Sequence, residues 1–405
     1  MTGIPITVFG AILLAASIAA ILSRRLRIPY SVGLVAAGMV LTLLPVSIAV
    51  PLSRELIFTF FLPPLVFQAA IELKWRYFRR NLPATLLLAF PGVVIAAAVV
   101  ACGTHLLLGW SWLGASLFGV LIAATDPVSV IAAFKEMKAQ PRLSLLVESE
   151  SLLNDGAAAV AFGVLIAIAE GAPGSIGFVT GSLLWTVAGG VLSGLAVAGA
   201  LLVLAGRTED HLVEITLTTL AAYGSFLLAE HFGMSGVLAS LSAGLLVGNI
   251  GWRGAISPGG RGHVLAFWEF AAFLANSIIF ILIGSHEAHQ PLALFTGAAA
   301  IAILLSLAGR AAAVYPLSAL LRPTRLRLEP AYQHVLFWGG LRGALALALA
   351  LALPASIPER GEIIVVAFAV VAFSIFVQGL TMPWLIRKLD LTIEGGRSAP
   401  ELRDD

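Results

Sequence analysis

Charged side chains are scarce in this chain. Of its 405 residues only 11% are Asp, Glu, Lys or Arg, whereas about a quarter of a soluble domain is charged. Hydrophobic residues make up 59%, and the mean hydropathy is +0.99. This composition excludes a water-soluble fold and predicts an integral membrane protein.

Cysteine is almost absent as well. The single Cys102 excludes an intramolecular disulfide, and it lies in an apolar stretch where a reactive thiolate would be poorly solvated. We interpret it as a packing residue. The first apolar stretch has no basic residues before it and is followed by many others, which predicts a spanning helix rather than a cleaved signal peptide.

Long apolar runs are what the chain has in abundance. A spanning helix needs roughly 20 mostly apolar residues. Thirteen stretches meet this requirement: 4–22, 28–45, 56–73, 83–107, 112–134, 150–169, 177–205, 212–230, 234–250, 264–284, 291–321, 331–353 and 362–386. No linker between them is long enough to separate domains, so we expect one transmembrane domain over residues 1–386 and a short polar tail over 387–405.

The basic residues test this assignment, because Lys and Arg concentrate in cytoplasmic loops. All but four of the 24 fall in the alternate connections that follow odd-numbered spans, or in the tail. The opposite side has Arg54 and Arg360, and Arg310 and Arg342 lie inside spans. We predict an extracellular N-terminus and a cytoplasmic C-terminus. The basic run 74–80 then sets topology next to a span and is not a nucleic-acid patch.

A carboxylate interrupts the fifth span. An ionisable group at mid-bilayer costs about 2.5 to 3.5 kcal/mol, so such groups face a partner or a wet cavity. Asp126 stands directly before Pro127. Proline removes an amide donor and disfavours helical geometry in the residue before it, which predicts that the helix unwinds at Asp126. A simple proline kink capped by the aspartate is the alternative.

The sixth span begins with a second polar cluster. Residues four apart share a helix face, so Ser151 aligns with Asp155 and Glu150 with Asn154. The first pair offers oxygen ligands suited to a hard cation, and the second offers a charge with an amide to orient it. A helix cap alone is the alternative for Asn154 and Asp155.

The twelfth span has an arginine among three glycines, Gly339, Gly340 and Gly343, which favour another break. Arginine keeps its charge, so Arg342 requires a carboxylate partner, and we predict Glu150. Snorkelling of Arg342 to an interface is the alternative. For Arg310, structural pairing and a helix-end contact both stay open.

Two interrupted helices in corresponding positions of two inverted halves are typical of secondary transporters with a midplane ion site. The fifth and twelfth spans cross in opposite directions, and each is interrupted near its middle. An intramembrane hydrolase that uses Asp126 and Asp155 as a carboxylate pair is a remote alternative. A non-transporting scaffold leaves the buried charges unexplained.

The same stretches resemble the monovalent cation:proton antiporters, in the sodium/proton exchanger branch. The similarity covers nearly the whole transmembrane chain, and the matching stretches are 61–64, 125–128, 134–136, 141–142, 150–156, 267–270, 276–277, 283–284 and 338–344. The resemblance implies an all-α polytopic membrane protein with an inverted-repeat antiporter fold, in which unwound helices 5 and 12 cross. It also implies a homodimer in the cell membrane, with six core helices that move against a dimerisation domain.

The resemblance assigns roles to individual residues. Asp155 becomes the main carboxylate that binds Na⁺, Li⁺ or H⁺, and Asp126, Ser151 and Thr125 complete the Na⁺ ligands. Asn154 supports the site, and Glu150 with Arg342 forms a structural ion pair. No cofactor and no enzyme activity are expected. Asn154 resembles the electroneutral branch, which exchanges one cation per proton.

One position departs from the family pattern. Gln68 stands where prokaryotic relatives often have an acidic residue, and glutamine does not titrate. Gln68 and Arg310 are therefore expected only as supporting residues, and Glu72 would replace the missing acid only if its helix were rotated. Exchange of K⁺ for H⁺ by the same fold is the alternative function.

Overall fold

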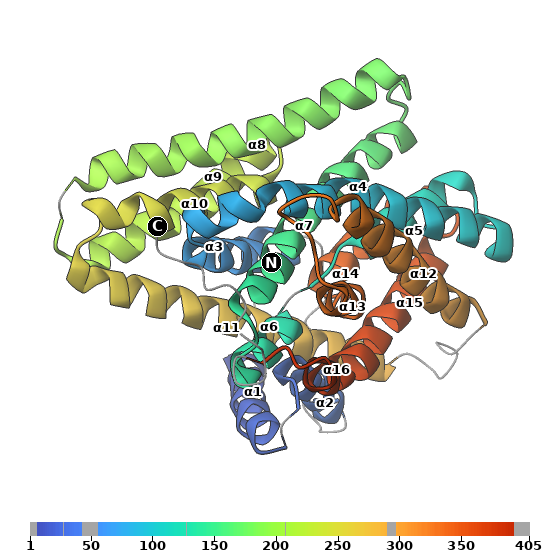
Figure 1. Ribbon diagram of the computed structural model, residues 1–405, viewed down its shortest axis with the longest axis horizontal. Coiled ribbons are helices and arrows are strands. Elements are labelled where there is room, and N and C mark those ends of the chain that lie inside the picture. The colour runs from blue at the N-terminus through green and yellow to red at the C-terminus, as the bar shows by residue number, and fades with distance from the viewer. Residues whose placement is uncertain are drawn as a thin grey trace.

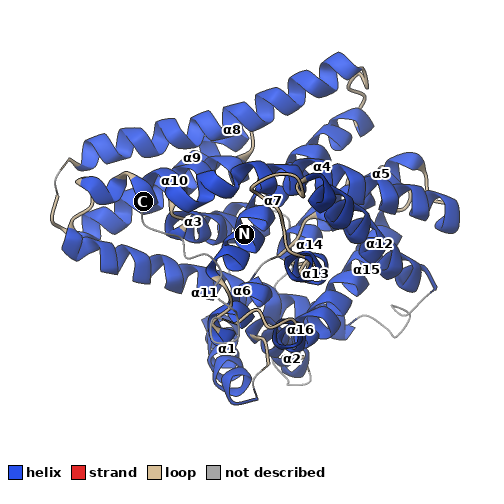
Figure 2. Cartoon of the chain, viewed as in Figure 1, coloured by secondary structure: helices blue, strands red, loops and turns tan. Residues whose placement is uncertain are grey.

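The computed structural model describes residues 6–26, 28–42, 56–126, 128–206, 208–289 and 297–392, and these residues are almost entirely helical (Figure 2). The helices are α1 (Ile6–Leu26), α2 (Tyr30–Leu41), α3 (Leu62–Glu72), α4 (Trp75–Leu108), α5 (Trp112–Ala123), α6 (Val128–Met137), α7 (Pro141–Ala169), α8 (Ile176–Ala205), α9 (His211–His231), α10 (Gly236–Asn249), α11 (Pro258–His289), α12 (Gly297–Leu320), α13 (Pro330–Trp338), α14 (Ala344–Leu351), α15 (Arg360–Phe373) and α16 (Leu380–Lys388). Two π-helical segments, Leu56–Phe61 and Ser374–Gly379, lead into α3 and α16.

Each predicted span overlaps at least one helix. Eight helices in the described ranges are long and apolar enough to cross a membrane alone. The count of thirteen crossings and the orientation of the termini stay predictions. Residues 43–45 and 291–296 of two predicted spans, and most of the tail, lie outside the described residues.

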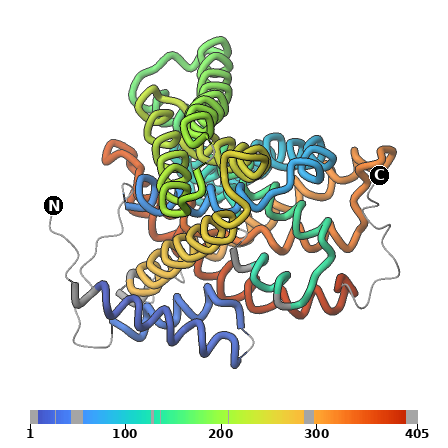
Figure 3. Tube along the Cα trace, turned by 90° about the vertical axis from the view of Figure 1, so that its left-hand side faces the viewer, coloured from blue at the N-terminus to red at the C-terminus, as the bar shows by residue number. Residues whose placement is uncertain are grey.

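The helices form two packed groups. Helices α8, α9 and α10 pack together with α3, and they occupy the upper left of Figure 1. Helices α4, α5, α12 and α15 pack around α7 and α14 on the other side. Seen from the side, the α8 to α10 bundle lies far from α1 and α2 (Figure 3).

Small residues allow helices of this protein to approach one another closely, as expected where lipid provides no hydrophobic driving force between helices. Helices α2 and α11 show this clearly. A Cβ built on Gly38 would lie 2.2 Å from the Ile281 carbonyl oxygen, and one built on Gly284 would lie 2.0 Å from the Val35 carbonyl oxygen. Only glycine fits on either side of this contact.

Two pairs of short helices replace the fifth and twelfth predicted spans. Helix α5 ends at Ala123 and α6 begins at Val128, while α13 ends at Trp338 and α14 begins at Ala344. The two non-helical segments meet, because the Asp126 N–H donates to the Leu341 carbonyl at 2.7 Å. Backbone groups that each helix leaves unpaired are thus partly satisfied by the other break.

Candidate ion site

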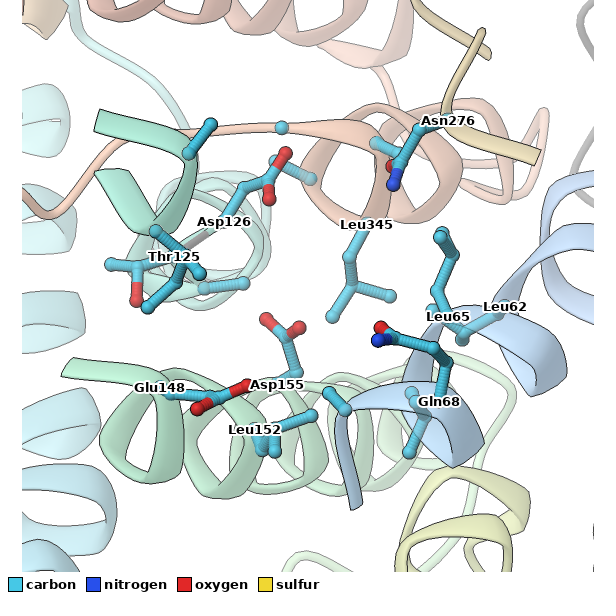
Figure 4. Close-up of a pocket in the computed structure, with 18 of the residues that line it drawn as sticks. Leu62, Leu65, Gln68, Thr125, Asp126, Glu148, Leu152, Asp155, Asn276 and Leu345 are labelled. Atoms are coloured by element: carbon cyan, nitrogen blue, oxygen red, sulfur yellow. The ribbon is translucent and has the colours of Figure 1, made fainter. Parts of the chain in front are cut away.

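A half-enclosed cavity of about 240 Å³ lies where the two helix groups face each other. Its wall includes Asp126 from the first break and Asp155 from α7, whose carboxylates point into the same space (Figure 4). Gln68 of α3 and Asn276 of α11 line the same cavity. The structure therefore brings together the two carboxylates that the sequence singled out.

Asn154 holds the first break in place from the neighbouring α7. Its Oδ1 accepts the Thr125 N–H at 3.1 Å, and its Nδ2 donates to the Thr125 Oγ1 at 2.6 Å. The same Nδ2 also donates to Glu150 Oε1 at 3.2 Å. One amide thus satisfies an N–H that the end of α5 leaves unpaired and connects it to a buried carboxylate.

Ser151 also contacts Thr125. The Ser151 Oγ donates to the Thr125 carbonyl oxygen, and the Thr125 Oγ1 donates to the Ser151 Oγ at 3.3 Å. Thr125 lies on the cavity wall, whereas Ser151 and Asn154 are buried behind it. Thr125 therefore lines the cavity together with the two carboxylates, and Ser151 and Asn154 lie one layer behind it.

The predicted ion pair between Glu150 and Arg342 is wrong. Glu150 pairs with Arg310 of α12, whose Nη1 lies 2.7 Å from Oε1 and whose Nη2 lies 3.0 Å from Oε2. Arg310 also donates to the Leu336 carbonyl at the end of α13, from Nε at 3.1 Å and from Nη2 at 2.9 Å. The planar guanidinium of Arg310 forms a bidentate contact with a carboxylate. Arg310 reaches the end of α13 because α12 packs directly beside that helix.

Arg342 instead contacts residues of the second break, of which it is itself a part, and Ser374. Its Nη1 donates to the Gly340 carbonyl, and its Nε is buried without a hydrogen-bond partner among the described residues. The Ser374 Oγ accepts the Arg342 N–H and donates to the Arg342 carbonyl, both at 3.0 Å. Arg342 thus supports the second break, and it does not form the predicted ion pair with Glu150.

Gly343 explains how closely the second break approaches the first. A Cβ built there would lie 2.2 Å from Asp126 Oδ2 and 2.5 Å from its Cβ. Glycine is therefore required for the aspartate to reach the cavity beside α14.

Comparison with known proteins identifies the family. A family model described as sodium/hydrogen exchanger, transmembrane, matches residues 12–388. The chain belongs to the sodium/hydrogen exchanger family. The resemblance inferred from the sequence is confirmed, and the chain is a multi-pass membrane protein.

Named members of the exchanger family are similar over most of their length. The low-affinity Na⁺/H⁺ antiporter NhaS1 of Synechocystis sp. is 40% identical over 373 residues, which cover 90% of this chain and 70% of the relative. The Na⁺/H⁺ antiporter ApNhaP of Aphanothece halophytica is 40% identical over 369 residues, with the same two coverages. A solved structure of the sodium proton antiporter MjNhaP1 of Methanocaldococcus jannaschii matches with a TM-score of 0.78 at 20% identity, covering 95% of this chain and 98% of that one. This last match shows the shared fold.

Three polar or charged residues of the cavity wall were missed as site residues by the sequence reasoning: Lys135, Glu148 and Asn276. For Glu148 a signal existed, because it precedes Asp155 by seven residues, or about two helical turns, and so shares its face. We expected the span to begin at residue 150, whereas α7 begins at Pro141, where proline suits the first turn of a helix.

Gln68 lies on the wall, as a supporting residue would. Its Nε2 donates to Glu72 Oε1 at 2.7 Å. Glu72 is at the exposed end of α3 and does not replace the missing acid beside Asp155.

Proposed function

We propose that the protein is a secondary active transporter that exchanges Na⁺ or Li⁺ for H⁺, one for one, by alternating access to Asp155. The observation that carries the proposal is the half-buried Asp155 carboxylate, which faces Asp126 across a cavity at the meeting point of two helix breaks. Unwound backbone and buried carboxylates of this kind are typical of midplane ion sites. Both relatives described above are named Na⁺/H⁺ antiporters.

Competition between the two ions follows from the charge of the site. Among the described residues, Arg310 is engaged by Glu150 and Arg342 by Gly340, so Asp155 has neither buried arginine as its salt-bridge partner. A cation or a proton must then neutralise it in turn. Because Asn154 does not titrate, replacement of one cation by one proton leaves the charge of the site unchanged, which favours electroneutral exchange.

The proposed Na⁺ ligands are the carboxylates of Asp126 and Asp155 and the oxygens of Thr125 and Ser151. Such oxygen ligands suit hard cations. Exchange of K⁺ for H⁺ at the same site is the second candidate, and a salt series with Na⁺, Li⁺ and K⁺ distinguishes the two. We further propose a homodimer in the cell membrane, with the N-terminus outside, as the distribution of basic residues favours.

The test is the substitution Asp155→Asn in proteoliposomes that contain a pH-sensitive dye. Addition of Na⁺ should release protons from wild-type vesicles and should produce no signal with the variant, because an amide does not take up a proton near neutral pH and has no negative charge to neutralise a cation. Asp390→Asn is the matched control, since Asp390 is exposed after α16 and has a φ of 54° that asparagine also adopts. Cation-driven proton movement by Asp155→Asn would refute the assignment, and a rate that responds to an imposed membrane potential would refute the stoichiometry.

A further inference from the structure

Two charged side chains, Lys135 and Glu72, form a charged rim at one edge of the cavity. Lys135 of α6 lies on the wall, and its Nζ is 3.9 Å from Oε2 of Glu72. The side chains of this pair are 67% and 38% exposed, so the pair is in contact with water. Glu72 belongs to α3 and Lys135 to α6, so the pair connects two helices that both line the cavity.

Glu148 lines the same cavity as Lys135 and the proposed ion site. It projects from the same face of α7 as Asp155, and both line the cavity (Figure 4). Two helical turns separate them, a rise of roughly 10 Å. The charges of Glu72 and Lys135 both act on Glu148. A cation that enters beside the rim is therefore exposed to the charges of two carboxylates and one ammonium in addition to Asp155.

We propose that Lys135 controls cation entry, by acting as the resident counter-ion of Glu72 and Glu148. With all three groups charged the rim has a net charge of −1, and without the ammonium it has −2. An exposed ion pair at this separation is weak, so an incoming cation displaces the ammonium readily. Lys135 is thus a residue that sets the apparent cation affinity without contacting the bound ion, and this role rests on the exchange proposed above.

The experiment measures Na⁺-driven proton movement in everted membrane vesicles, which present the rim to the outer solution. Lys135→Gln should lower the KM for Na⁺ by about two- to tenfold with kcat unchanged, the range that a unit charge at roughly 10 Å from an entering cation produces between high and intermediate dielectric. Lys135→Arg should retain the wild-type KM. Arg325→Gln, which removes an exposed charge from the connection between α12 and α13 near the start of α7, should also leave KM unchanged.

A second pair of measurements separates electrostatic control from a structural effect. Raising the ionic strength with choline chloride should reduce the difference between Lys135→Gln and the wild type, because salt screens exposed charges. Glu148→Gln should raise KM by a similar factor, and combining it with Lys135→Gln should bring KM back towards the wild-type value.

An unchanged KM in Lys135→Gln, or a change in KM that persists at high ionic strength, would overturn the proposal while exchange itself stands. Absence of any Na⁺-driven proton movement in the wild type would overturn both proposals. The arginine variant keeps these outcomes apart from misfolding, since it preserves the charge and nearly the size of the side chain.

Discussion

The buried ion pair between Arg310 and Glu150 allows a quantitative test of how the site is supported. The substitution Arg310→Met removes two short contacts to the Glu150 carboxylate and two donors to the Leu336 carbonyl. Glu150 is 2% exposed, and it would keep the Asn154 amide at 3.2 Å as a hydrogen-bond donor. Removal of one partner of a buried pair costs about 3–5 kcal/mol, because it leaves a buried charge uncompensated.

Thermal unfolding of the purified protein in detergent measures this loss, and a double-mutant cycle isolates the pair. Glu150→Gln and Arg310→Met should each lower the stability, and the double variant should recover much of the sum, since removal of both charges is often nearly neutral. Arg342→Met is the matched control. It should cost less, because the described contacts of that guanidinium include a backbone carbonyl but no carboxylate.

Two results would refute this reasoning. One is a larger loss of stability from Arg342→Met than from Arg310→Met, which would restore Arg342 as the partner of Glu150. The other is strict additivity in the double variant, which would show that the two side chains do not interact. Either result would mean that the second break is held by contacts other than those described.

Further predictions concern the two breaks. Gly343→Ala should abolish Na⁺/H⁺ exchange in the vesicle assay, because the added Cβ would lie 2.2 Å from Asp126 Oδ2. Gly163→Ala in α7 is the control. No atom lies within 4 Å of its added Cβ, so this variant should keep transport intact. Asn154→Ala should lower the stability by about 1–3 kcal/mol in thermal unfolding, because it leaves the buried Thr125 N–H without its acceptor. A variant at Asn154 with wild-type stability would show that water replaces the amide.

Much of the candidate site was predictable from local sequence. A carboxylate before a proline, and a serine four residues before a second carboxylate, identify Asp126, Ser151 and Asp155 as polar groups inside membrane spans, where they are costly. Helical spacing also contained the signal for Glu148, which shares a face with Asp155. These inferences need only the geometry of one helix.

The partner of each arginine was not predictable in this way. Arg310 and Arg342 both lie inside apolar spans, and both offered a charge to Glu150. Which arginine pairs with Glu150 depends on which helix packs beside α7 and on how far each guanidinium reaches. In the structure the guanidinium of Arg310 pairs with Glu150. Spacing along a helix contains no information on neighbours that are 160 residues away in sequence.

The sequence by itself determined that the chain is helical and membrane-bound, because a segment with apolar side chains in lipid must satisfy its own backbone hydrogen bonds. It also determined where helices break and which carboxylates cannot face lipid. Only the tertiary structure decided that the two breaks meet through Asp126 and Leu341, that Arg310 neutralises Glu150, and that Lys135 approaches Glu72 at the cavity rim. Each of these depends on distances between helices, which are set by the packing of small side chains across the whole bundle.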